Sequence, residues 1–308
     1  MTRRSEPSHT ASPASQRGLE SGVVRVDAAT HVWGDGSAPF PWSPWDGVPL
    51  PDTPAPPSAL LNSLSEHSFD AAVCVQPRVY GYDHGYLRAV LQAHPGRITG
   101  VGLVDPGSEG AVSALERHVR EGFSGVRFIT ADRPVPSWLA RREGDPVWDA
   151  AVACGIPVSV LVAPSHLQDL ALRARRSPDT VIVIDHLGLV SAGAAPEFGR
   201  ELLRCAIADN VHVKISALGA LSSAPWPYLD LEEFVREIMS AFGPHRVVFG
   251  TDWPHNLDHG PWDADVRAIE AWSLDTQVDA LLGGNAARLW RLRSPACRAA
   301  TGEGGDRG

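Results

Sequence analysis

Eight short runs of apolar residues, most of them rich in valine and isoleucine, recur along the chain and predict β-strands. Most gaps between them hold stretches with helical spacing, such as "EGAVSALERHVREG" and "DLEEFVREIMSAFGP". Nearly continuous apolar strands that alternate with helices are typical of a parallel sheet covered on its outer faces. The pattern therefore predicts an α/β fold, a (β/α)8 TIM barrel. The eight runs are "VVRVDAATHVW", "AAVCVQP", "RITGVGLVD", "GVRFIT", "PVSVLVA", "TVIVIDHLG", "NVHVKIS" and "HRVVFGTDW".

A doubly wound open sheet is the main alternative, because the same alternation builds both folds. Such a sheet would more naturally carry a glycine-rich phosphate loop after its first strand. The chain instead has "GDGSAPFPWSPWDGVPLPDTPAPP", a long loop rich in proline and tryptophan. We therefore expect one barrel domain over residues 21–294, with disordered tails at 1–20 and 295–308.

The composition and net charge of the chain limit the classes of partner that it can bind. A net charge of -9 with 44% hydrophobic residues fits a soluble globular protein with a small-molecule substrate, and an acidic surface disfavours nucleic acid and anionic membranes. The basic N-terminus lacks an apolar run behind it, which predicts neither a secretory signal nor an anchor and favours the cytoplasm. The four cysteines are far apart and form no visible disulfide or zinc pattern. Barrels often pair through exposed helices, so a homodimer is one outcome to test.

Polar residues cluster at the ends of the predicted strands, where a barrel places its active site. Ionisable groups in apolar runs are costly to bury unless they are paired or functional. These residues are Asp27 and His31 on the first strand, Arg127 on the fourth, Asp185 and His186 on the sixth, His212, Lys214 and Ser216 on the seventh, and Asp252 on the eighth.

The sequence resembles the amidohydrolase superfamily, in the branch that contains 2-pyrone-4,6-dicarboxylate lactonase and the sugar-acid lactonases. The matching segments are "VDAATHVW", "VCVQPRVYGYDHGYL", "GVGLVDP", "GVRF", "VIDHLG", "VKIS", "RVVFGTDWPH" and "GNAARLW", which together span about residues 23–292. "VIDHLG" and "FGTDWPH" are fairly specific in combination. The resemblance implies a distorted barrel, hydrolysis at a carbonyl centre, and an aspartate on the last strand that activates water.

The first strand departs from the superfamily pattern. Asp27, Ala29 and His31 should share one face of a regular strand, and Ala29, native or introduced, stands where the superfamily commonly has the first of two histidines. The fifth strand also lacks the histidine that many metal-dependent relatives have. His31, His186 and Asp252 remain as tentative metal ligands, with His212 as a weaker substitute. A metal-free site and a site with one or two divalent metals, Zn, Fe or Mn, both stay open.

In a metal-free mechanism Asp252 would take a proton from the attacking water. His31, His186 and Arg127 would stabilise the oxyanion through charge-assisted hydrogen bonds. His255 could reach the same mouth from the next loop.

Three nearby polar residues favour structural roles. We expect Asp185 to pin a loop through backbone hydrogen bonds, with the adjacent His186 pointing to the opposite side. His212 is expected to be a core histidine and Lys214 a strand-end charge.

The substrate predicted from the loops is an apolar or aromatic lactone, ester or thioester. Leu189 follows "DHLG", where the dicarboxylate lactonases look arginine-rich, which argues against a doubly charged substrate. Arg78 and Arg133 remain as anion contacts. Loop tryptophans that could overhang the mouth supply apolar contact area; these are Trp33, Trp42, Trp45 and Trp226.

Three functions follow from these patterns. The first is a carbonyl hydrolase acting on a lactone or ester. The second is a metal-dependent thioester hydrolase or aromatic-acid decarboxylase, and the third is a barrel that only binds a ligand.

Overall fold

The computed structural model describes residues 24–45, 47–130, 137–272 and 278–292. It contains one parallel eight-stranded sheet whose strands follow their order in the sequence. Every strand that the hydrophobic pattern predicts is present. The predicted disordered tails, residues 1–20 and 295–308, lie outside the described residues. The strands are β1 (Val26–Thr30), β2 (Ala71–Val75), β3 (Ile98–Leu103), β4 (Gly125–Ile129), β5 (Val158–Leu161), β6 (Ile182–Ile184), β7 (Val211–Ile215) and β8 (Val247–Phe249).

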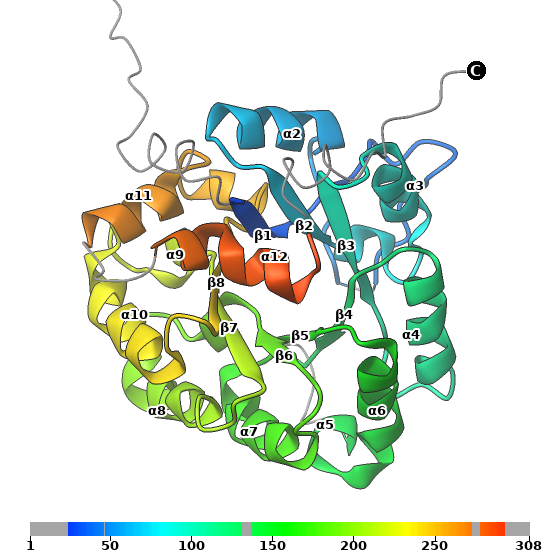
Figure 1. Ribbon diagram of the computed structural model, residues 1–308. Coiled ribbons are helices and arrows are strands. Elements are labelled where there is room, and N and C mark those ends of the chain that lie inside the picture. The colour runs from blue at the N-terminus through cyan, green and yellow to red at the C-terminus, as the bar shows by residue number, and fades with distance from the viewer. Residues whose placement is uncertain (1–23, 46, 131–136, 273–277, 293–308) are drawn as a thin grey trace, which may run out of the picture.

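The sheet closes on itself where β1 meets the segment that follows β8. The His31 N–H donates to the Trp253 carbonyl at 2.7 Å, and the Asp252 N–H donates to the Ala29 carbonyl at 2.8 Å. Figure 1 shows the strands gathered at the centre with helices around them. The fold is therefore a (β/α)8 barrel and not a doubly wound open sheet.

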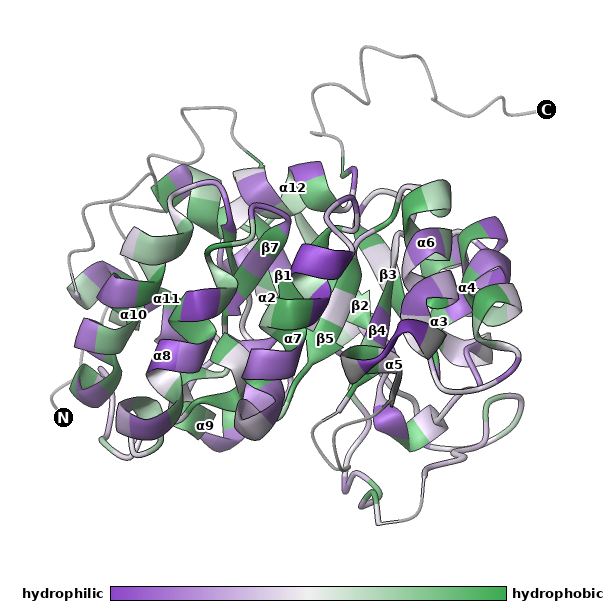
Figure 2. Ribbon diagram, turned by 90° about the horizontal axis from the view of Figure 1, so that it is seen from below, coloured by the Kyte–Doolittle hydropathy of each residue, from purple (hydrophilic) through white to green (hydrophobic). Residues whose placement is uncertain are grey.

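Helices cover the outer face of the barrel and turn their apolar sides toward it. In Figure 2 the surrounding helices carry hydrophilic residues, and the strands are predominantly hydrophobic. Burial of both strand faces explains why the strands read as apolar runs without strict alternation. The helices are α2 (Pro57–Glu66), α3 (Gly85–Ala93), α4 (Ala111–Arg120), α5 (Ser137–Ala140), α6 (Asp145–Cys154), α7 (Leu167–Arg176), α8 (Ala195–Cys205), α9 (Leu218–Leu221), α10 (Leu229–Phe242), α11 (Ala264–Ala271) and α12 (Asn285–Leu289).

The inside of the barrel is filled at the end where the strands begin. Val26, Val73, Val183 and Val248 pack there into one buried cluster with Trp290, which follows α12. Figure 1 shows α12 lying across this end of the barrel. Because this end is closed, a substrate has to enter from the opposite end, where the strands finish.

A β-bulge in β1 changes which side chains face the interior. Asp27 pairs with Ala72 but Thr30 pairs with Cys74, so β1 has one extra residue in this interval. Val26 faces the interior before the bulge and His31 faces Asp252 at the mouth after it, whereas strict alternation would put positions 26 and 31 on opposite faces. The expectation that residues 27, 29 and 31 share one face by simple alternation is therefore wrong.

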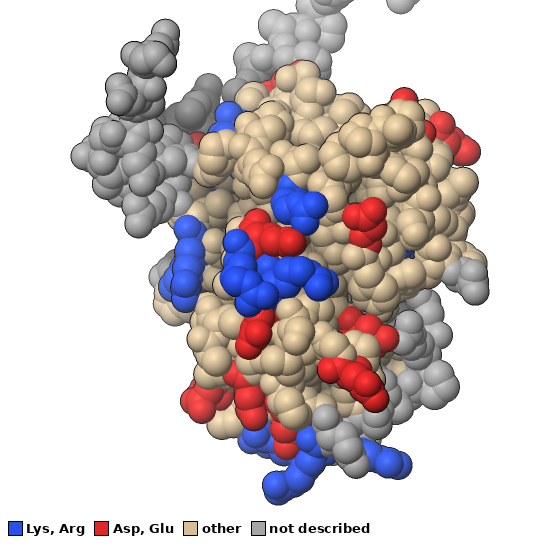
Figure 3. All heavy atoms as spheres, turned by 90° about the vertical axis from the view of Figure 1, so that its right-hand side faces the viewer, with Lys and Arg blue, Asp and Glu red and all other residues tan. Residues whose placement is uncertain are grey.

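The outer surface carries charges of both signs. Figure 3 shows blue and red side chains intermixed on the side of α3, α4 and α6. Pairs such as Arg88 with Glu121, 3.0 Å apart, contribute to this mixture. Among the described residues, no helix combines the length and the apolar character needed to cross a membrane.

Candidate active site

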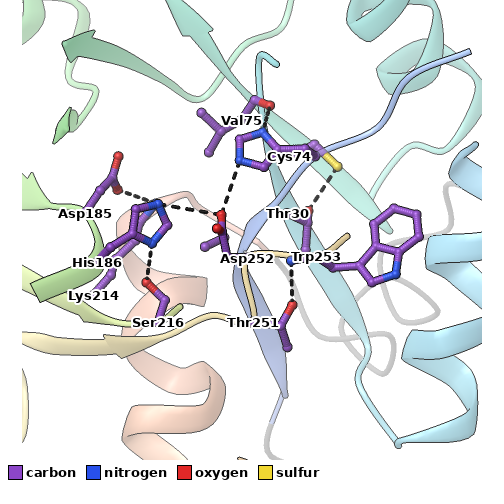
Figure 4. Close-up of polar contacts among 12 residues, drawn as sticks. Thr30, Cys74, Val75, Asp185, His186, Lys214, Ser216, Thr251, Asp252 and Trp253 are labelled. Carbon is purple, nitrogen blue, oxygen red and sulfur yellow. Dashed lines mark hydrogen bonds and ion pairs between the residues drawn. The ribbon is translucent and has the colours of Figure 1, made fainter. Parts of the chain in front are cut away.

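The carboxylate of Asp252 lies at the open end of the barrel, in the turn that follows β8. Its Oδ1 is 3.4 Å from Nε2 of His31 and 3.6 Å from Nε2 of His186, as Figure 4 shows for His186 and Asp252. The Asp252 side chain keeps 16% of its surface exposed, so a ligand entering the mouth can reach it. The structure thus brings together three side chains that lie far apart in the sequence.

The ring of His31 is oriented by the end of β2. Its Nδ1 lies 2.8 Å from the carbonyl oxygen of Val75. Because a carbonyl oxygen can only accept a hydrogen bond, Nδ1 carries a proton and donates it. The other ring nitrogen, Nε2, therefore faces Asp252.

The ring of His186 is oriented by the end of β7. Its Nδ1 lies 2.9 Å from the hydroxyl of Ser216, which is fully buried. His186 begins the short helix η4 (His186–Leu189) with a left-handed φ of 49°. Since β6 already ends at Ile184, alternation no longer applies, and Asp185 and His186 both turn inward. The expectation that they point to opposite sides is wrong for this reason.

The two imidazoles favour an ionised Asp252. Burial alone raises the pKa of a carboxyl group, but His186 and His31 outweigh it and hold the pKa of Asp252 below its usual range. Asp252 is therefore a carboxylate at neutral pH and can accept a proton.

A buried ion triad lies next to these residues. Asp185 is 2.8 Å from Nε of Arg127 and 2.9 Å from Nζ of Lys214, and all three side chains are almost fully buried. Although burial raises the pKa of Asp185, the two cations lower it to about 2. Asp185 thus pairs with two cations instead of pinning a loop through backbone hydrogen bonds, and Lys214 is an interior residue instead of a strand-end charge. The structure places Arg127 in this triad.

One wall of the mouth is aromatic. The ring of His255 lies 5.4 Å from that of His31 and 5.5 Å from that of Trp33. Trp33 is buried and donates from Nε1 to the Thr53 carbonyl, while His255 is exposed. The long loop after β1 therefore contributes directly to the surroundings of His31.

The other predicted substrate contacts differ in burial and in the residues that surround them. Arg78 is half-buried just after β2, and Arg133 falls outside the described residues. Trp42 packs against the core and Trp45 against Tyr82, whereas Trp226 is exposed beside α11.

His212 lies apart from this cluster. It is the second residue of β7 and lines a cavity of about 380 Å³ together with Arg288 and Arg291, which flank the end of α12. The cavity is at the end of the barrel where the strands begin, so His212 and Asp252 lie toward opposite ends.

The donor set at the mouth does not fit a resident catalytic metal. Ala29 offers no ligand atom, and His212 is at the other end of the barrel. Within residues 24–45, 47–130, 137–272 and 278–292, no three His, Cys, Asp or Glu side chains are arranged to hold a metal ion. A three-ligand centre of the catalytic type thus has no counterpart in this described part of the chain.

Comparison with known proteins places this barrel in a family. The model of the amidohydrolase family matches residues 26–292. The chain belongs to the amidohydrolase family. This amidohydrolase is 29% identical over 283 residues to an L-fucono-1,5-lactonase of Burkholderia ambifaria, covering 89% of this chain and 97% of the relative. It is 31% identical over 253 residues to a 2-pyrone-4,6-dicarboxylate hydrolase of Comamonas testosteroni, covering 77% and 80%.

A solved structure supports the same relationship. The crystal structure of a putative 2-pyrone-4,6-dicarboxylic acid hydrolase from Pseudomonas putida has a TM-score of 0.75 to this amidohydrolase at 26% identity, over 88% of this chain and 98% of the other. The family resemblance inferred from the sequence motifs is therefore confirmed.

Two contributors to the site were missed in the sequence. The Val75 carbonyl orients His31, but a backbone group leaves no signal in residue type. Lys214 was recognised as charged but not as interior. Its place within a buried strand, two residues before Ser216, is the signal that could have revealed it.

Proposed function

We propose that this amidohydrolase hydrolyses a lactone or related ester of an apolar or aromatic organic acid, with Asp252 activating water. The observation that carries the proposal is the Asp252 carboxylate, reachable from the barrel mouth and flanked by Nε2 of His31 and of His186. An ionised carboxylate beside imidazole groups is suited to general base catalysis.

The reaction follows from the chemistry of these three side chains. Asp252 removes a proton from water as the water oxygen bonds to the carbonyl carbon of the lactone. The oxyanion accepts a hydrogen bond from Nε2–H of His186, whose Nδ1 accepts from the Ser216 hydroxyl, and from Nε2–H of His31 when both nitrogens of that ring are protonated. One such donor commonly contributes about 3 kcal/mol. The bond from that carbon to the ring oxygen then breaks, and the ring oxygen takes the proton from Asp252. The product is an open-chain hydroxy acid.

The surroundings of Asp252 favour a substrate with an apolar part. Trp33 and His255 form an aromatic wall beside His31. Arg127 and Lys214 are already paired with Asp185, so their charges are not available to bind the carboxylate of an acidic substrate. The two relatives are named for a sugar lactone and a pyrone dicarboxylate, and the shared chemistry we carry over is the opening of a cyclic ester.

The direct test is a panel of lactones, aryl esters and thioesters, with acid release followed by a pH indicator. We expect turnover of at least one apolar lactone, and a loss of about 100- to 10,000-fold in Asp252→Asn. Asp230→Asn, at an exposed position of α10, is the matched control and should keep full activity.

Other results of the panel would favour the other functions. Thioester turnover or decarboxylation that is lost with a chelator would favour metal-dependent chemistry. Ligand binding with equal, negligible turnover in wild type and Asp252→Asn would favour a barrel that only binds.

We further propose a cytoplasmic location and a homodimer that pairs through barrel helices. The free thiols of Cys74, Cys154 and Cys205 support the first, because a reducing compartment keeps cysteines unpaired. Light scattering on the purified protein tests the second, since a monomer at all concentrations would contradict it.

A further inference from the structure

The turn that carries Asp252 has an unusual backbone. Asp252 has a φ of 67°, in the left-handed region, which few residues other than glycine adopt. Such a conformation persists only where the surroundings hold it in place. The contacts that hold this turn therefore also set where the Asp252 carboxylate points.

The Asp27 side chain holds one neighbour of Asp252 directly and the other through the Thr251 hydroxyl. The Asp27 carboxylate accepts the Thr251 N–H at 2.9 Å and the Thr251 hydroxyl at 2.6 Å. The same hydroxyl oxygen accepts the Trp253 N–H at 3.0 Å. Asp27 is completely buried, so these bonds are not in competition with solvent.

Ala29 holds Asp252 through its backbone. Its carbonyl accepts the Asp252 N–H at 2.8 Å, and its N–H donates to Asp27 at 3.2 Å. The two strands approach closely here, because a Cβ built on Gly250 would lie 2.5 Å from the Cβ of Ala29. A small residue at position 29 fits this approach.

We propose that Asp27 is a positioning residue for Asp252, holding the Thr251–Trp253 turn so that the Asp252 carboxylate faces His31 and His186. The first strand, which lacks a histidine at position 29, thus contributes a clamp for the base in place of a ligand. The effect on turnover rests on the proposed function, but the effect on geometry does not.

The variants Asp27→Asn and Thr251→Val test this clamp. Asn cannot accept from all three donors at once, and Val removes the hydroxyl that links Asp27 to Trp253. We expect kcat on the best lactone to fall about 10- to 100-fold with KM within about twofold, since misplacing a catalytic group by about 1 Å has effects of this size. Thr251→Ser keeps the hydroxyl and should restore most of the kcat lost in Thr251→Val.

Asp70→Asn is the matched control. Asp70 also binds a backbone N–H near the start of β1, that of Arg25 at 2.8 Å, but at the far end of the barrel. The Asp70→Asn variant should leave kcat unchanged. Thermal melting of every variant checks that it is folded.

A second readout does not depend on turnover. Imidazole ¹⁵N NMR spectra, with His31 and His186 assigned from single substitutions, report whether Nε2 still faces a carboxylate. We expect both signals to shift in Asp27→Asn and Thr251→Val and to stay in place in Asp70→Asn. If Asp27→Asn does not fold, Thr251→Val carries the test alone.

Unchanged imidazole signals in a folded Asp27→Asn or Thr251→Val protein would overturn the clamp, even if kcat fell. Shifted signals in a protein whose wild type opens no lactone would support the clamp and refute the proposed function instead.

Discussion

Different groups orient the two imidazoles beside Asp252. The Val75 carbonyl holds Nδ1 of His31, and the Ser216 hydroxyl holds Nδ1 of His186. A carbonyl always accepts, whereas a hydroxyl either donates or accepts. Nε2 of His186 is therefore able to hold or to release a proton as Ser216 rotates, while the proton on Nδ1 of His31 stays fixed.

Loss of the Ser216 hydroxyl should slow turnover. In Ser216→Ala, Nδ1 of His186 has no hydroxyl partner, and a hydrogen bond of this kind contributes about 0.5–1.5 kcal/mol. We expect kcat for lactone opening to fall about 3- to 10-fold. Ser222→Ala, in which a hydroxyl bonded to exposed Asp230 is removed, should leave kcat unchanged. Equal kcat values in both variants would contradict the orienting role.

Removal of the single negative charge from the Arg127–Asp185–Lys214 triad should lower the free energy of unfolding more than removal of one of its two positive charges. Asp185→Asn leaves two buried cations without their counter-ion, and breaking a buried pair in this way costs about 3–5 kcal/mol. Lys214→Met leaves Arg127 paired with Asp185 and should cost less. Urea unfolding of both variants measures the difference, and a smaller loss for Asp185→Asn than for Lys214→Met would contradict this account.

At the scale of elements, the sequence predicted all eight strands, because burial on both faces leaves long apolar runs. It also pointed to His31, His186 and Asp252, since parallel strands end at one mouth. The bulge in β1 was not predictable, because it depends on the register of β1 against β2. The interior pairing of Lys214 depends on three strands at once, and no local pattern reports it.

The packing of α3 and α4 against the end of β3 contains a histidine pair that should make stability depend on pH. The rings of His84 and His118 lie 4.1 Å apart, and Nε2 of His84 accepts the Leu103 N–H. Burial lowers the pKa of His84 to about 3, and the neighbouring His118, Arg117 and Arg88 lower it too. The Tyr82 carbonyl at Nδ1 opposes this shift in part.

The sign of the pH effect follows from proton binding. Between about pH 6.5 and pH 3 the unfolded state binds a proton at His84 and the folded state does not, so stability is complete above pH 6.5 and falls as the pH falls. From pH 7 to pH 4 this group should remove about 3 kcal/mol from the free energy of unfolding. Urea unfolding across that range should give a flatter curve for His84→Gln than for wild type. His245→Gln, at an exposed site, should follow wild type, and parallel curves for all three proteins would contradict the prediction.

At the scale of the whole molecule, the two ends of the barrel have separate tasks. Trp290 and the valine cluster close one end, and the bulged strand, the His186 turn and the Asp252 turn build the mouth at the other. Left-handed backbone occurs at His186 and at Asp252. Contacts at the mouth itself, such as those of Thr251 with Asp27 and of His186 with Ser216, hold these conformations.

We propose that Asp252 activates water for lactone opening without a bound metal. The most direct measurement is the rate of lactone opening by chelator-treated protein whose Zn, Fe and Mn content is determined on the same sample. We predict that wild type keeps its rate with less than about a tenth of a metal equivalent per chain, and that Asp252→Asn loses at least about 100-fold. A rate that disappears on chelation and returns in proportion to added Zn, Fe or Mn would contradict the account.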